Sequence, residues 1–279
     1  MRTISADEIT KKVRQLCMDA SYDLSPDVEN ALKSAMKKEI SPTGKEILRQ
    51  ILENSEIARK ESMPMCQDTG FSVFFVDIGE DAHVDGNISE AINKGVSQGY
   101  KEGYLRKSVL KDPVQGGNTG DNTPAIIYYD FVPGDKIKIV ALPKGGGSEN
   151  MSAIRMGKPA DGAEGVIDFV VQKVSEAGPN PCPPIVVGVG IGGTFERCAM
   201  MAKKSLLRPL GEPNPDPFYA DMEKTIMEKV NNLGIGPQGL GGITTCLGVS
   251  ILAHPRHIAS FPMAVNIECH AHRHKEIVI

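Results

Sequence analysis

The pattern of apolar residues changes near residue 62, and this change limits the folds that the chain can form. In the first part, apolar residues recur at helical spacing, and Ser5, with Glu8 three positions later, has the signature of a helix cap. Phe71–Ile78 then has the β-branched and aromatic content of a strand. We therefore expect a helical N-terminal segment, about 1–62, ahead of an α+β core, about 63–279.

Helices and strands are mixed in this core. The turn Pro133-Gly134-Asp135 lies between two strand-like runs, Ala125–Val132 and Lys136–Leu142, which predicts a β-hairpin. The other expected elements are helices at about 86–103, 160–177, 194–206 and 215–233, a strand at about 185–191 and two final strands. This mixture favours an α+β fold, with mixed β-sheets and packed helices in a single domain, over a strict winding of βαβ units.

Composition and charge argue against several classes of function. The 279 residues, of which 41% are hydrophobic, can bury a substantial core. A formal net charge of −4 provides no basic field for a phosphate backbone, so nucleic acid is not an expected partner. No apolar run approaches the roughly 20 residues of a membrane helix, and the N-terminus lacks the apolar stretch of a signal peptide. We expect a cytoplasmic protein whose six cysteines stay reduced.

Three cysteines stand in polar or proline-bounded motifs. Cys66 precedes Gln-Asp-Thr-Gly, Cys182 is flanked by prolines, and Cys269 lies between Glu268 and His270. A thiolate is a nucleophile and a soft ligand for zinc, copper or iron–sulfur clusters, and three thiolates would leave a metal one open position for a substrate. The three are more than eighty residues apart and lack the C-x-x-C spacing of zinc ribbons. Spacing alone therefore leaves a metal site and ordinary loop cysteines equally open.

The other three cysteines have surroundings typical of a core. Cys17 falls on the apolar face of an expected helix, and Cys198 follows the same pattern. Cys246 lies in the strand-like run Thr244–Leu252, where a small buried hydrophobe is ordinary. Cys246 remains the chief alternative for a third ligand.

Gly188–Gly193 follows an apolar strand, precedes an expected helix and fits the G-x-G-x-x-G pattern of dinucleotide-binding proteins. The acidic residue expected about 20 positions later, at the end of a second strand, is replaced by the proline-rich run Leu210–Pro217. The glycines therefore favour close packing of strand and helix, or close approach of the backbone to a ligand, over dinucleotide binding.

Two other loops are suited to anions. Lys144–Asn150 leads into an expected short helix, so its free backbone N–H groups could hold a carboxylate. Gln115–Pro124 is dense in amides and hydroxyls that can position oxygen-rich groups, although an ordinary turn explains it equally well. Arg106 could bind a carboxylate through two hydrogen bonds, or could be a surface residue.

Five of the six histidines fall within 21 positions, from His254 to His274. Histidine can act as a general acid or base near neutral pH, or as a metal ligand. The sequence leaves both roles open.

Taken together, these motifs resemble the alpha subunit of two-subunit class I fumarate hydratases and of the closely related L-tartrate dehydratases. The resemblance spans nearly the whole chain, and none of its motifs is sufficient alone. They are Cys66–Gly70, Gly117–Pro124, Lys144–Asn150, Cys182–Pro184, Pro255–His257 and Cys269-x-Ala271-x-Arg273. The resemblance implies a single iron–sulfur hydratase alpha domain over residues 1–279.

The resemblance also implies a cofactor and a set of site residues. It implies an oxygen-sensitive [4Fe–4S] cluster held by Cys66, Cys182 and Cys269, whose fourth iron binds the substrate as a Lewis acid. It further implies substrate-binding roles for Gln67, Arg106 and Gly146, and catalytic roles for Asp68, near the transferred proton, and His257, as an acid or relay.

The implied reaction is the reversible hydration of fumarate to L-malate, with L-tartrate dehydration as the alternative. In single-chain family members a second domain supplies further groups for the dicarboxylate, whereas this sequence stops at Ile279. The resemblance therefore implies a separate beta subunit, an active site shared between chains and an α2β2 assembly, so that this chain alone is expected to be nearly inactive.

Three other functions remain open. An iron–sulfur electron carrier would normally use four protein ligands. A nicotinamide oxidoreductase depends only on Gly188–Gly193. A scaffold subunit without catalytic residues is the third alternative.

Overall fold

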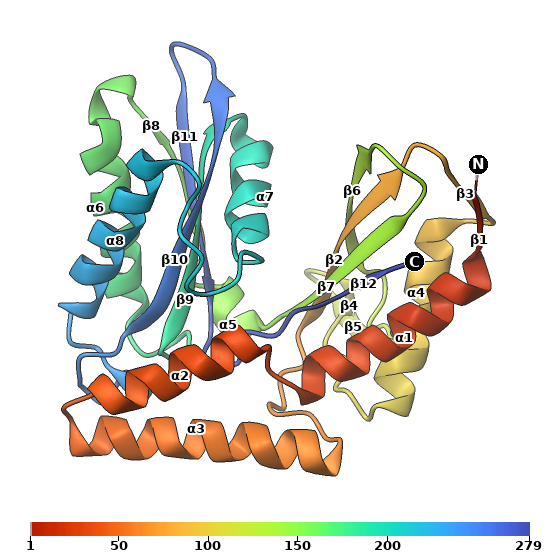
Figure 1. Cartoon of the computed structure of the whole chain (residues 1–279), viewed down its shortest axis with the longest axis horizontal. Helices are drawn as coiled ribbons and strands as arrows, with labels where there is room; N and C mark the ends of the chain where they lie inside the picture. Colours follow the sequence, from red (N-terminus) through yellow and green to blue (C-terminus); the bar gives the residue numbers. More distant parts are fainter. Residues whose placement is uncertain (1) are drawn as a thin grey trace. The chain divides into compact units, whose positions relative to one another are not determined.

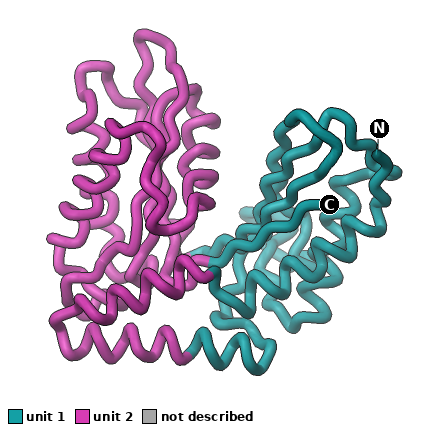
Figure 2. Tube along the Cα trace, in the orientation of Figure 1, with its two compact units in different colours: residues 1–25, 54–146, 273–279 teal, residues 26–53, 147–272 magenta. Residues whose placement is uncertain are grey.

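The computed structural model describes residues 2–279, which form two compact units (Figure 2). Unit 1 comprises the described residues up to Ser25 together with residues 54–146 and 273–279, and unit 2 comprises residues 26–53 and 147–272. Each unit has its own four-stranded sheet and its own hydrophobic core. That residues 1–279 act as a single hydratase domain stays a prediction.

Unit 1 is a mixed sheet covered by two helices. Its main sheet has the strand order β12-β7-β2-β6, and helices α1 and α4 pack against each other beside it (Figure 1). The elements are β1 (Arg2–Ser5), α1 (Ala6–Tyr22), β2 (Phe71–Gly79), β3 (Ala82–Asp85), α4 (Ile88–Glu102), β4 (Leu110–Asp112), β5 (Gly116–Asn118), β6 (Ile126–Val132), β7 (Ile137–Lys144) and β12 (Lys275–Val278). Ser5 caps α1 as predicted, because its side chain accepts the N–H groups of Asp7 and Glu8.

The predicted hairpin around Pro133-Gly134-Asp135 is wrong. Strands β6 and β7 do not pair with each other, because β2 lies between them, parallel to β6 and antiparallel to β7. The turn instead passes the end of β2, where Gly79 donates to the Lys136 carbonyl over 2.9 Å. The burial of Val73–Val76 explains this order, since so apolar a strand is more stable between two neighbours than at an edge.

Unit 2 is a second mixed sheet with helices on both faces. Its strand order is β10-β9-β11-β8, in which β10 and β9 are parallel and the other pairs antiparallel. Helices α6 and α8 cover one face and α7 the other (Figure 1). The elements are α2 (Pro26–Lys38), β8 (Ala153–Gly157), α6 (Gly162–Ala177), β9 (Ile185–Gly193), α7 (Phe195–Ser205), α8 (Pro217–Asn231), β10 (Cys246–Arg256) and β11 (Phe261–Glu268), with 3₁₀ turns η1 (Pro159–Asp161) and η2 (Pro237–Gly239).

Two helices include residues of both units. Helix α3 (Pro42–Glu61) begins in unit 2 and ends in unit 1, and the short helix α5 (Gly146–Glu149) begins with the last residue of the 54–146 segment. Within the described residues, no helix combines the length and the apolar character needed to cross a bilayer.

The Gly188–Gly193 motif serves strand–helix packing, one of its two favoured interpretations. A Cβ atom on Gly188 would lie 2.1 Å from the Ala202 carbonyl oxygen, and one on Gly190 would lie 2.1 Å from the Cys198 carbonyl oxygen, both in α7. These distances are far below van der Waals contact, so only glycine lets α7 approach β9 this closely.

The predicted α+β class, with helices near the N-terminus followed by mixed sheets and packed helices, is confirmed. Each helix expected in the core is present within a few residues of its expected bounds. The two expected final strands are β10 and β11, and the sequence missed the short β12 that follows them.

Candidate active site

The Cys66–Gly70 segment joins α3 to β2 in unit 1. Cys66 and Asp68 are half-buried, and Gln67 is exposed. The Asp68 carboxylate accepts two backbone N–H groups, from Gly70 at 3.0 Å and from Gly146 at 2.8 Å. Both oxygen atoms of Asp68 are therefore held, and the orientation of its carboxylate is fixed.

Two more predicted site residues lie beside this segment. The Thr69 hydroxyl donates to the Arg106 carbonyl over 2.8 Å, which attaches the Arg106 segment to the Cys66–Gly70 segment. The Arg106 side chain is exposed and makes no ion pair within residues 2–279, so it is available for a carboxylate. Gly146, at the start of α5, directs its N–H to Asp68. Unit 1 thus brings together Cys66, Gln67, Asp68, Arg106 and Gly146.

Position 70 requires glycine, because a side chain there would not fit. Its backbone has φ +77°, and a Cβ atom would lie 2.7 Å from the Lys144 carbonyl carbon. An L-residue would be strained in this conformation and would push β7 away from the Cys66–Gly70 segment. The close approach of these two chain segments is what lets Gly146 reach Asp68.

Cys182 and Cys269 come together in unit 2, at the same end of its sheet. Cys182 precedes β9, and Cys269 follows β11, the antiparallel neighbour of β9. His270 connects the two loops, since its backbone N–H donates to the Cys182 carbonyl over 3.3 Å and its Nδ1 lies 3.0 Å from the same oxygen. Cys182 is exposed and has a left-handed backbone, with φ +55°, that few side chains adopt.

Glu268 supports the Cys269 loop from inside unit 2. Its buried carboxylate accepts the Cys269 backbone N–H at 3.1 Å and the Ser148 hydroxyl at 3.1 Å. The sequence did not predict this role, although the position of Glu268 directly before Cys269 was a signal.

His257 lies far from both cysteines of its unit. It follows β10, at the opposite end of the sheet from Cys182 and Cys269. Strands β9 and β10 run in parallel from Ile185 to Gly193, so the two ends of the sheet are about 25 Å apart along the strands. The His257 side chain is exposed, and its Nδ1 accepts the Ala259 N–H at 3.2 Å, so a neutral ring would carry its proton on Nε2.

The three core-like cysteines are confirmed as buried. Burial raises the pKa of Cys17, Cys198 and Cys246 to about 12. The Cys246 thiol also donates to the Gly248 carbonyl. A protonated, buried thiol is a poor ligand, which argues against Cys246 as the alternative third ligand.

The donor chemistry of the remaining thiols fits an iron–sulfur cofactor. Cys66, Cys182 and Cys269 are exposed or half-buried in loops, as cluster ligands require access to metal. Cys66 belongs to unit 1, and Cys182 and Cys269 belong to unit 2. Within residues 2–279, no group of three His, Cys, Asp or Glu side chains forms a metal site by itself.

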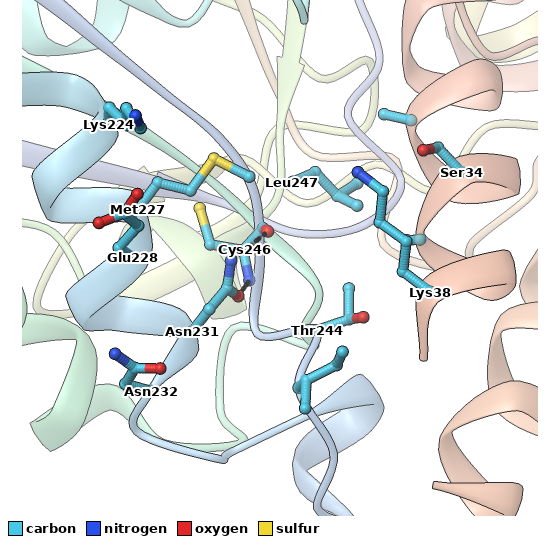
Figure 3. Close-up of a pocket in the computed structure, with 13 residues that line it drawn as sticks. Ser34, Lys38, Lys224, Met227, Glu228, Asn231, Asn232, Thr244, Cys246 and Leu247 are labelled. Carbon is cyan, nitrogen blue, oxygen red and sulfur yellow. Dashed lines mark hydrogen bonds between the residues drawn. The ribbon is translucent and has the colours of Figure 1, made fainter. Parts of the chain in front are cut away.

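A cavity of about 770 Å³ lies elsewhere in unit 2 (Figure 3). It lies between α2, α8 and the segment from Ile243 to Leu247. Cys246 lies in its wall beside Asn231, whose side-chain oxygen accepts the Thr245 and Cys246 N–H groups. Its described lining includes none of the predicted site residues.

Comparison with known proteins identifies relatives along the whole chain. Residues 10–278 match the family described as fumarate hydratase (Fumerase). A Methanocaldococcus jannaschii protein named "Putative L(+)-tartrate dehydratase subunit alpha" is 44% identical over 272 residues, which cover 95% of each chain. The L(+)-tartrate dehydratase subunit alpha of Escherichia coli O157:H7 is 34% identical over 279 residues, which cover 99% of this chain and 92% of that protein.

Proposed function

The chain belongs to the fumarate hydratase family, and we propose that it is the alpha subunit of an iron–sulfur hydro-lyase that reversibly hydrates fumarate to L-malate. Family membership and the dehydratase names of its relatives support hydro-lyase chemistry. The observation that carries the proposal is the arrangement in unit 1, where a fixed Asp68 carboxylate and Arg106, which has no ion pair among the described residues, lie on adjoining segments.

The side chains of unit 1 have complementary roles in this reaction. The Arg106 guanidinium binds one substrate carboxylate, and the exposed Gln67 amide hydrogen-bonds a substrate oxygen. Asp68, oriented by the Gly70 and Gly146 N–H groups, takes or relays the C3 proton. Gly146 thereby acts through Asp68, and its predicted contact with the substrate stays a prediction.

Cys66, Cys182 and Cys269 would hold the [4Fe–4S] cluster, which supplies a Lewis acid that polarises the hydroxyl group lost on dehydration. Glu268 and His270 fix the loops of two of these ligands. A role of His257 as an acid or relay stays a prediction, since His257 lies at the far end of the unit 2 sheet from those two ligands.

The relatives suggest a partner and a second substrate. They are named subunit alpha, which supports a separate beta subunit, and we propose an α2β2 assembly in a cytoplasmic setting. Their names also make L(+)-tartrate the second candidate substrate.

The test is turnover by the complex with its beta subunit, purified without oxygen and offered fumarate, L-malate and both tartrate enantiomers. Turnover of fumarate and malate is expected, whereas turnover of L(+)-tartrate alone would move the assignment to tartrate dehydration. No turnover by a cluster-loaded complex would reject the hydro-lyase and favour an electron carrier.

Asp68→Asn tests the site within the same complex. The variant is expected to lose at least about 100-fold in kcat while it keeps cluster and assembly, because proton transfer by a placed carboxylate contributes that much. Asp112→Asn is the matched control, since Asp112 also accepts two backbone N–H groups, from Val114 and Gln115, in an exposed turn. Full activity of Asp68→Asn would favour a scaffold role for this chain.

A further inference from the structure

Arg273 is a buried arginine that has no carboxylate partner in the part of the chain that the structure describes. It is 1% exposed and forms no ion pair with any residue from 2 to 279. One nitrogen, Nη2, donates to the Asp68 carbonyl over 2.9 Å. The Nε and Nη1 atoms are also buried and have no hydrogen-bond partner within the described residues. A guanidinium in this state is costly, because its charge has lost water without gaining a counter-ion.

The carbonyl that Arg273 holds is one of three consecutive carbonyls held by side chains. The Thr69 carbonyl oxygen lies 2.9 Å from the Tyr100 hydroxyl, and the Gly70 carbonyl accepts from the Asn122 amide at 3.2 Å. Tyr100 and Asn122 are fully buried, like Arg273. The Cys66–Gly70 segment is therefore fixed from inside unit 1 while its first residues face outward.

Arg273 is the only charged group among these three donors. Burial raises the pKa of Tyr100, an effect that the Asp68 charge reinforces and the Arg273 charge opposes. Both charges thus act at the same hydroxyl, and Tyr100 stays a neutral donor. Of these three donors, Arg273 is the one that brings a positive charge to the segment that carries the Asp68 carboxylate and the Cys66 thiol.

We propose that Arg273 is a positioning residue for the reaction proposed above: it holds the Asp68 main chain through the Asp68 carbonyl and places a buried positive charge beside the segment that carries the Asp68 carboxylate. The proposal rests on the proposed function for its kinetic consequence. Its structural consequence, that Arg273 orders this segment, does not depend on the substrate.

Two variants separate charge from geometry. Arg273→Met removes the charge and the donors but keeps much of the volume, and replacing a buried charge with an apolar group often leaves stability intact. Arg273→Lys keeps the charge but replaces the planar guanidinium with a single ammonium group, so partial recovery of the wild-type exchange rates and kcat is expected. Arg59→Met is the control, because Arg59 is an exposed arginine of unit 1 that pairs with Asp23.

The first measurement is amide hydrogen exchange of the assembled complex. In Arg273→Met, the Gly70 and Gly146 N–H groups, which both bind the Asp68 carboxylate, are expected to exchange at least about 10-fold faster. Helix α1 and the Arg59→Met control should exchange as in the wild type. Wild-type exchange at both glycines in the Met and Lys variants would overturn the proposal.

The second measurement is steady-state kinetics of the same complexes. A displaced Asp68 should lower kcat by at least about 30-fold in Arg273→Met and change KM less than about 3-fold, because the loss falls on the transition state. Wild-type kcat despite faster exchange would overturn the link to the reaction.

If the wild-type complex itself has no hydro-lyase activity, the proposed function fails, and the exchange measurement alone decides whether Arg273 orders the Cys66–Gly70 segment. Should Arg273→Met not assemble, Arg273→Lys decides both measurements.

Discussion

Gly146 donates its backbone N–H to the Asp68 carboxylate over 2.8 Å, across 78 positions of sequence. The bond connects the start of α5 to the segment that carries Cys66. It depends on the close approach of Gly70 to the Lys144 backbone, so the two glycines should respond differently to a methyl group.

Gly70→Ala is expected to destabilise the protein by at least about 2 kcal/mol, because alanine is strained at φ +77° and its Cβ would overlap the Lys144 backbone. Gly146→Ala should stay within about 0.5 kcal/mol of the wild type, since its nearest contact is Asp68 Oδ2 at 3.8 Å. Urea unfolding measures both. Equal midpoints for the two variants would contradict this assignment.

Glu39→Gln is expected to lower the free energy of unfolding by about 1.5–3 kcal/mol at neutral pH, the usual value of hydrogen bonds to a buried charge. The Glu39 carboxylate accepts the N–H groups of Ile243 at 3.1 Å and Thr244 at 2.9 Å, besides two at the end of α2. The exposed Glu56→Gln on α3 is the control and should unfold like the wild type.

The same carboxylate gives a pH dependence of stability. Burial favours the neutral form of Glu39, but hydrogen bonds from Ser41, Ile243 and Thr244 outweigh it and hold the pKa below the ordinary value. Its contribution is therefore complete above the unfolded pKa, about 4.3, and is lost as pH falls through the folded pKa. The stability gap between wild type and Glu39→Gln should narrow below about pH 4; a gap that widens there would refute this reading.

Thiol alkylation should separate the six cysteines into two groups. With a pKa raised to about 12, Cys17, Cys198 and Cys246 hold almost no thiolate at pH 8 and should stay unmodified by iodoacetamide in the native, metal-free protein. The exposed Cys182 should react first. Cluster loading should protect Cys66, Cys182 and Cys269, as peptide mass spectrometry would show. Rapid labelling of Cys246 would reopen its candidacy as a ligand.

Gly190→Ala should destabilise unit 2 by roughly 1–3 kcal/mol or prevent folding, because its Cβ would lie 2.1 Å from the Cys198 carbonyl and push α7 from β9. Gly147→Ala is the control, with 3.6 Å to its nearest neighbour. Thermal unfolding compares them. A Gly190→Ala protein as stable as the control would mean that α7 can shift without loss.

The sequence predicted local structure well and strand pairing poorly. Apolar periodicity located the helices, and the residues that flank each cysteine in the sequence distinguished buried thiols from loop thiols. The hairpin prediction failed because adjacency in sequence favoured pairing of β6 with β7, whereas the burial of β2 placed it between them. That order depends on tertiary packing, which turn chemistry does not encode.

The candidate site shows the same limit. Motifs indicated Asp68 and Arg106, but no local pattern predicted that Thr69 would attach the Arg106 segment or that Tyr100 and Asn122 would hold the adjoining carbonyls. Nor could spacing show that His257 lies at the other end of its sheet from Cys269, since that follows from strand direction.

Strand β9 begins shortly after Cys182, and its antiparallel neighbour β11 ends just before Cys269, so both cysteines lie at one end of the sheet. The residues between the two cysteines include α7, α8 and the loop that carries His257. A single residue inserted within β9 or β11 would shift the register of these strands and separate the two cysteines. The loop between β10 and β11, which carries His257, can by contrast change in length while Cys182 and Cys269 stay side by side at the other end of the sheet.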